Sequence, residues 1–141
     1  MSFKPASRPE NDSKRVEAVV RTGVLDVNAA KLYEIYCDLA VEITGCPTSW
    51  TGVIDTDRQF ALARVGFPED LPMEVPRNQT LCQFALEVGK PLIISDMRKD
   101  DRFKFHPIVT DRGVKFFSQS LAHSCRARGK PPCLGNVATC V

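Results

Sequence analysis

Residues 76–117 decide the fold and read PRNQTLCQFALEVGKPLIISDMRKDDRFKFHPIVTDRGVKFF. Thr80 is followed three residues later by Gln83, the spacing of a capping box, which predicts the start of a helix. Apolar residues then recur at helical spacing, at Leu81, Phe84, Ala85 and Val88. Gly89 and Pro91 are typical of a helix end. This stretch therefore predicts a short helix that stops just before residue 90.

The rest of this stretch predicts a strand followed by a long excursion. Residues 92–94 are apolar and end at Ser95 and Asp96, as a short strand would. Residues 96–113 are too polar and too long for a tight turn, yet they carry apolar residues at Phe103, Phe105, Ile108 and Val109. We therefore expect residues 96–113 to fold down onto the domain as a lid.

Upstream, the pattern predicts two helices and a hairpin. Residues 14–21 predict a short helix closed by Gly23, and Asn28 can cap a second helix. The second helix carries one apolar stripe, formed by Leu32, Ile35, Tyr36, Leu39 and Ile43. Strands are predicted at 50–54 and 59–65, and their short connection indicates an antiparallel hairpin. Helices beside an antiparallel sheet make an α+β fold.

These segments, taken in order, closely resemble the GAF domain, a sensory ligand-binding module. The resemblance covers residues 15–117 and rests on Arg15, 22–26, 39–40, 54–60, Pro76-Arg77, Leu81-Cys82, 91–94, Asp96, 101–103, 106–109 and 114–117. It implies a central antiparallel sheet flanked by helices, with a ligand cavity between the sheet and the lid. After Phe117 the chain departs from the pattern, so the final strand and the closing helix are expected to be atypical or missing.

Several residues are candidates for the wall of that cavity. The resemblance implies that polar and aromatic lid residues line or lock it, namely Asp96, Asp101, Arg102, Phe103 and His106. Trp50, Cys82 and Phe117 complete the set of candidates. A structural alternative is favoured for residues 101–103, in which Asp101 and Arg102 form a salt bridge or bond to the backbone while Phe103 fills the core. His106, followed by Pro107, can instead mark a turn.

A second polar cluster lies at the predicted hairpin tip, at Asp55, Asp57, Arg58 and Gln59. It could contact a ligand or a partner. The favoured interpretation is a turn whose aspartates bond to their own backbone.

The chain has six cysteines, at 37, 46, 82, 125, 133 and 140. Disulfides are not expected in a cytosolic protein. Cys37 and Cys82 fit small core residues, although a helix N-terminus at Cys82 would lower a thiol pKa. His123 and the three cysteines after it do not have the spacing of a common zinc site, so no metal is expected. The sequence names no cofactor.

Composition sets the limits of the function. At 141 residues the chain can build one core, and a net charge of +2 argues against nucleic acid and anionic membranes as partners. The start of the chain resembles no signal peptide, so a cytoplasmic location is expected. We expect a flexible leader at 1–13, a GAF-like domain at 14–117 and an atypical cysteine-rich segment at 118–141.

Three functions follow from this sequence. The leading hypothesis is a sensor without catalytic residues, which binds an unknown small molecule and acts through a homodimer or a separate output protein. The second is an enzyme that reduces free methionine sulfoxide with a cysteine nucleophile, as some free-standing GAF proteins do. The third is an interaction module with no ligand that works by dimerisation.

Overall fold

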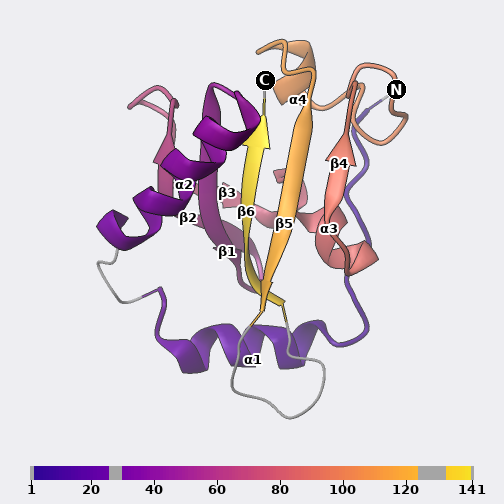
Figure 1. Cartoon of the computed structure of the whole chain (residues 1–141). Helices are drawn as coiled ribbons and strands as arrows, with labels where there is room; N and C mark the ends of the chain where they lie inside the picture. Colours follow the sequence, from indigo (N-terminus) through magenta and orange to yellow (C-terminus); the bar gives the residue numbers. More distant parts are fainter. Residues whose placement is uncertain (1, 26–29, 124–132, 141) are drawn as a thin grey trace.

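The computed structural model describes residues 2–25, 30–123 and 133–140. One six-stranded antiparallel sheet forms the centre, in the order β3-β2-β1-β6-β5-β4 (Figure 1). The elements along the chain are α1 (Asp12–Thr22), α2 (Ala30–Thr44), β1 (Thr48–Ile54), β2 (Arg58–Val65), β3 (Glu74–Pro76), η1 (Arg77–Gln79), α3 (Gln83–Val88), β4 (Leu92–Ile94), α4 (Pro107–Thr110), β5 (Phe117–His123) and β6 (Cys133–Cys140). The predicted α+β fold is confirmed.

The final strand is present and lies in the middle of the sheet. β6 pairs with β1 along one side and with β5 along the other, so both of its edges are bonded. Residues 135–137, which lie in a polar and cysteine-rich tail, take part in both ladders. The expectation that the final strand is missing is therefore wrong. A polar tail can still form a strand, because backbone pairing does not depend on the polarity of the side chains.

The two faces of the sheet carry different layers. On β1, Trp50 and Ile54 lie in a large apolar cluster with α3 and the lid, and we call this side the lid face. Val53 points to the opposite side, where it packs in a small cluster with Val19 of α1 and Tyr33 of α2. We call that side the α2 face. The period of two along the strand separates the faces.

The lid folds down as predicted. Met97, Phe103 and Val109 are buried in the large cluster, and residues 107–110 form the short helix α4. The ring of Phe103 lies edge-on to that of Phe84 in α3, with ring centroids 4.7 Å apart. Residues 96–113 therefore form a packed layer over one half of the lid face.

The start of α3 differs from the predicted capping box. The hydroxyl of Thr80 accepts the N–H of Cys82 at 3.2 Å, while the amide of Gln83 donates to the Thr80 carbonyl at 2.7 Å instead of accepting its N–H. The helix begins only at Gln83 because residues 77–79 form the separate turn η1. Its end is as predicted, with Gly89 in the left-handed conformation at φ 67°.

The segment expected to be a flexible leader contacts the domain. The backbone N–H groups of Ala6 and Ser7 donate to the side chains of Gln83 and Glu87 of α3, both at 3.1 Å. The ring of Phe3 packs on the large cluster. The first helix begins at Asp12, two residues before the expected boundary at 14.

The apolar stripe of α2 does not face the core. The side of α2 that meets the sheet is formed by Tyr33, which packs against Val53 and Leu62, and by the buried thiol of Cys37, 3.4 Å from the Thr51 hydroxyl. Leu32, Ile35, Tyr36, Leu39 and Ile43 are instead 50–74% exposed. We call these five residues the α2 stripe.

A buried ion cluster joins three distant segments. Asp12 at the start of α1 accepts from Arg15 at 3.0 Å and from both terminal nitrogens of Arg77 at 2.7 and 2.9 Å. Arg15 also donates to the carbonyl of Ile54, and Arg77 donates to the carbonyl of Asp55 at 3.1 Å. Burial acts to raise the pKa of Asp12, but the hydrogen bonds from Arg77 and Arg15 outweigh it and leave the pKa below its ordinary value. The cluster ties α1, the β1–β2 hairpin tip and η1 together.

Removing the carboxylate of this cluster should destabilise the fold strongly. Asp12→Ala leaves two buried guanidinium groups without their anion, which costs about 3–5 kcal/mol of unfolding free energy. Chemical denaturation measures this value, and Asp101→Ala, at an exposed carboxylate, is the matched control with a change within about 0.5 kcal/mol. Equal stabilities for the two variants would contradict a structural role for the cluster.

Candidate functional site

Four of the predicted site residues meet on the lid face of the sheet. Trp50 lies in β1, Phe117 in β5 and Phe103 in the lid, and Cys82 immediately precedes α3. All four are buried in the one large cluster. The Trp50 ring lies 5.9 Å from that of Phe117 and 5.5 Å from that of Phe67. These side chains form an aromatic wall with one thiol beside it.

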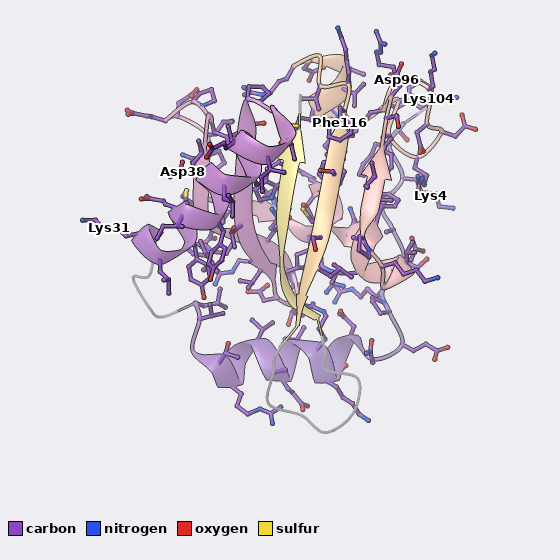
Figure 2. The ribbon with its side chains drawn as sticks, in the orientation of Figure 1. Lys4, Lys31, Asp38, Asp96, Lys104 and Phe116 are labelled. Carbon is purple, nitrogen blue, oxygen red and sulfur yellow. The ribbon has the colours of Figure 1, made fainter. Side chains whose placement is uncertain are left out.

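The three charged candidates of the lid form ion pairs with neighbouring lid residues, and the Arg102 guanidinium also lies 4.9 Å from the centroid of the Phe103 ring. Asp96 forms a two-pronged pair with Arg98 at 2.8 Å, and Figure 2 shows Asp96 at the rim of the molecule. Hydrogen bonds from Arg98 lower the pKa of Asp96 to about 2. The expected salt bridge between Asp101 and Arg102 is not formed. Asp101 pairs with Lys104 and Arg102 with Asp100, because each acid meets a base two or three residues later in the turns of the lid.

His106 holds the lid in place. Its Nδ1 accepts the N–H of Ile108 at 3.1 Å, so the proton lies on Nε2, which donates to the Gln79 carbonyl at 2.8 Å. The ring is buried against Phe3, with centroids 4.4 Å apart. Burial lowers the pKa of His106, and the bond to the Gln79 carbonyl only partly opposes this. The residue caps α4 and fastens the lid to η1, which agrees with the interpretation as a turn marker.

Two polar atoms on the lid face are buried without a hydrogen-bond partner. They are the indole Nε1 of Trp50 and the amide Oε1 of Gln119, and within the described part of the chain no other side-chain nitrogen or oxygen shares this condition. The two residues are only 8% and 3% exposed. Gln119 uses its Nε2 to donate to the Cys82 carbonyl at 3.4 Å, which turns Oε1 away from that bond.

Trp50 and Gln119 belong to one row across the sheet. Both pair with Ala138 of β6, from its two sides, and residues paired in this way share a face. Their Cα atoms are two strand spacings apart, about 10 Å. A donor and an acceptor thus lie on the same side of the sheet with a short residue between them in register. Gln119 could not be identified from the sequence, because its place in a polar stretch hides the alternation of its strand.

Comparison with known proteins agrees with this architecture. A GAF domain of an Acinetobacter phosphoenolpyruvate-protein phosphotransferase is 12% identical, with a TM-score of 0.62 over 94% of this chain and 77% of that one. Free methionine-R-sulfoxide reductase from Neisseria meningitidis, solved with its substrate, is 14% identical, with a TM-score of 0.59 over 99% of this chain and 80% of that one. The chain has the GAF fold.

The sequence comparisons are more distant. No family model matches the chain. The cyclic di-GMP phosphodiesterase PA2567 of Pseudomonas aeruginosa is 26% identical over 112 residues, which are 78% of this chain and only 18% of that protein. The chain thus matches one part of a much longer relative.

In this GAF fold the polar hairpin tip is a turn. The carboxylate of Asp55 accepts the backbone N–H groups of Asp57 and Arg58 at 3.1 and 3.0 Å. It also accepts Arg58 Nε at 2.8 Å. Burial acts to raise the pKa of Asp55, but these hydrogen bonds lower it overall. The favoured interpretation of this cluster, a turn bonded to its own backbone, is confirmed.

The described thiols differ in their surroundings. Cys82 is fully buried in the apolar cluster of the aromatic wall, whereas Cys37 lies on the α2 face, where burial raises its pKa despite a bond to Thr51. The side chains of Cys125, Cys133 and Cys140 lie outside the described residues. The predicted absence of a zinc site at these cysteines therefore also lies outside them. Among the described side chains, no group of three or more metal-binding residues comes together. No described helix is long and apolar enough to cross a membrane.

One open cavity of about 350 Å³ lies away from the aromatic wall. It is bounded by the N-terminal segment and the region around η1, with lining residues Pro5, Ala6, Arg8, Asp57, Arg77, Asn78 and Gln83. Arg77 is already bonded to Asp12, and Arg8 pairs with Asp57 at 3.3 Å. Each charged side chain that lines this cavity is therefore already held in an ion pair.

His106 should make stability fall in mildly acidic solution. Its pKa is lower in the folded state than the ordinary 6.5, so the unfolded chain binds the proton more readily and stability falls as the pH drops below about 6.5. His106→Asn keeps a capping side chain but cannot take up the proton. Denaturation between pH 8 and pH 5 should show the gap between the two proteins narrowing as the pH falls, while parallel curves would contradict the assignment. The lowered pKa of Asp12 acts only near pH 4 and below, outside this window.

Proposed function

We propose that this chain is a sensory domain that binds a small polar molecule on the lid face of its sheet. The observation that carries the proposal is the pair of buried, unpartnered atoms, Trp50 Nε1 and Gln119 Oε1. A buried polar group without a partner costs about 1–3 kcal/mol, and native proteins keep few of them. A ligand that binds both atoms recovers this cost.

The two atoms specify the chemistry of the ligand. The indole N–H is only a donor and the amide oxygen is only an acceptor. The ligand must therefore present an acceptor, such as a carbonyl or carboxylate oxygen, and a donor, such as an amine or amide N–H. Phe117 and Phe67 flank Trp50 and supply apolar contacts. A small metabolite with an amino-acid-like or amide-like edge fits this description.

The same fold offers a route from the ligand to the surface. His106 joins the lid to the carbonyl of Gln79 in η1. Arg77, in the same turn, holds Asp12 at the start of α1. A ligand that shifts the lid would pull on η1 and, through this ion cluster, on α1. We infer that the output passes through the helices to another chain.

Several comparisons support a sensory role. The Acinetobacter neighbour is the GAF domain of a phosphotransferase, and the curated relative is a cyclic di-GMP phosphodiesterase. The first name describes one domain of a larger protein, and this chain matches only 18% of the second protein. The free thiols of the described Cys37, Cys46 and Cys82 suit a reducing compartment, which supports the cytoplasmic location that we propose.

The proposal predicts a ligand that depends on the indole N–H. Native mass spectra of the protein purified from cells should show extra mass that is lost on denaturation. Trp50→Phe keeps an aromatic ring but removes the donor, so retention should fall about tenfold, the value of one hydrogen bond of about 1.4 kcal/mol. Phe60→Leu, which disturbs the small cluster on the α2 face, is the matched control and should keep the ligand.

Weakly bound ligands need a direct screen. Thermal shift with free methionine sulfoxide, the common amino acids and cyclic nucleotides should reveal at least one compound that stabilises the wild-type protein and not Trp50→Phe. If the protein carries no extra mass and no compound in the screen stabilises it, these results would contradict the sensor.

Reduction of free methionine sulfoxide is the second candidate function. The observation in its favour is the thiol of Cys82, buried in the same apolar cluster as Trp50 in a fold that the Neisseria reductase shares. A thiol that is fully buried must first be uncovered before it can attack a substrate.

Turnover distinguishes the two candidates. Free methionine sulfoxide and a thiol reductant should give no turnover with the wild-type protein if it is a sensor. Turnover that is abolished by Cys82→Ala and kept by Cys37→Ala would overturn the sensor in favour of the enzyme. Cys37 is the matched control because it is equally buried but lies on the α2 face.

A further inference from the structure

The α2 stripe is a large apolar surface with no described covering. Leu32, Ile35, Tyr36, Leu39 and Ile43 are each at least half exposed. From these exposed fractions, the five side chains offer roughly 500 Å² of apolar surface, which is near the upper end for a single patch on a monomer. Leu32, Tyr36, Leu39 and Ile43 follow the 4-3-4 spacing of a helix-pairing seam.

The stripe points along the sheet toward β6 and β5. Figure 2 shows Lys31 and Asp38 on the side of α2 that faces away from β6. At 100° per residue, the residues of the 4-3-4 seam lie about 100–160° around the helix from Asp38. Because α2 lies over β2 and β1 and reaches β6, this direction runs over the other half of the sheet (Figure 1).

That other half of the α2 face is open. Ile93 of β4, Ser118 of β5 and Ser49 of β1 belong to one row that continues through Thr139 of β6. Ser49 is 0% exposed, whereas Ile93 at the other end of the row is 69% exposed. Ser120, one row away on the same face, is also exposed. The described helices therefore cover β2 and β1 on this face and leave β5 and β4 uncovered.

We propose that a second copy of this chain covers both surfaces at once. A two-fold axis parallel to α2 would place the two α2 helices side by side, seam against seam, in one layer between two sheets. Each α2 would then cover β1 and β2 of its own chain and lie over β5 and β4 of its partner. Helices and sheets pack at about 10 Å, so the layer can touch both sheets.

The open half of the sheet favours this orientation over an antiparallel pair. With the two-fold axis perpendicular to the sheets, both sheets would lie on the same side of the helix pair. β5 and β4 of each copy would then run into the other sheet. The parallel arrangement places the sheets on opposite sides and avoids this overlap.

The size of the surface agrees with a specific dimer. Two stripes together bury roughly 1,000 Å² of apolar surface, and the open halves of the sheets add to it. A stable interface needs at least about 1,000–1,200 Å² in total. The contact is self-complementary because the same patch serves both copies.

The parallel register makes Leu39 face Leu39 of the second copy. Sedimentation of the wild-type protein at micromolar concentration should show a dimer. Leu39→Glu and Leu39→Lys each place like charges opposite one another, so each should raise the dimer dissociation constant at least about tenfold. Mixing the two variants should restore a dimer, because opposite charges then meet. Glu34→Lys changes an exposed residue outside the stripe and should leave the dimer intact.

Each other result would overturn the inference. A monomeric wild-type protein, or a dimer that survives Leu39→Glu, would exclude the α2 stripe as the interface. Variants that dissociate but do not recover on mixing would exclude the parallel register. Leu39→Cys checks the geometry separately: it should give a disulfide-linked dimer on mild oxidation beyond the wild-type background. None of these measurements depends on the ligand at Trp50.

Discussion

The ion cluster of Asp12, Arg15 and Arg77 is the constraint on which the rest of the fold depends. It joins residues 65 positions apart and also bonds the backbone at the tip of the β1–β2 hairpin. Without it, α1, the hairpin and η1 would share few polar contacts. Because η1 also carries the carbonyl that His106 holds, the cluster fixes the place from which the lid is anchored.

The sheet carries two different surfaces because its strands alternate. The lid face is covered by aromatic side chains and holds the unpaired atoms of Trp50 and Gln119. The described helices cover the α2 face only over part of its width, and α2 presents the α2 stripe to the outside. One face suits a small polar ligand and the other a protein surface, so ligand and partner need not compete.

The sequence predicted most of the fold and only part of the site. Helix ends at glycine, the strand 92–94 and the folded lid follow from local chemistry. The outward stripe of α2 could not be predicted, because periodicity shows that a helix has an apolar side but not which surface covers it. Asp12 and Gln119 were missed because their importance depends on partners far away in the chain. Asp96 and Asp101 are candidates for the cavity wall from the sequence, but each bonds a base two or three residues away.

The chain has a single tryptophan, so one indole N–H resonance reports on the proposed ligand site. The most direct measurement is the ¹H–¹⁵N spectrum of the labelled protein, recorded with and without the compound that raises its melting temperature. The account predicts that this resonance moves, as an unpaired N–H gains an acceptor. A compound that stabilises the protein but leaves the indole resonance in place would contradict the assignment of Trp50 as the donor to the ligand.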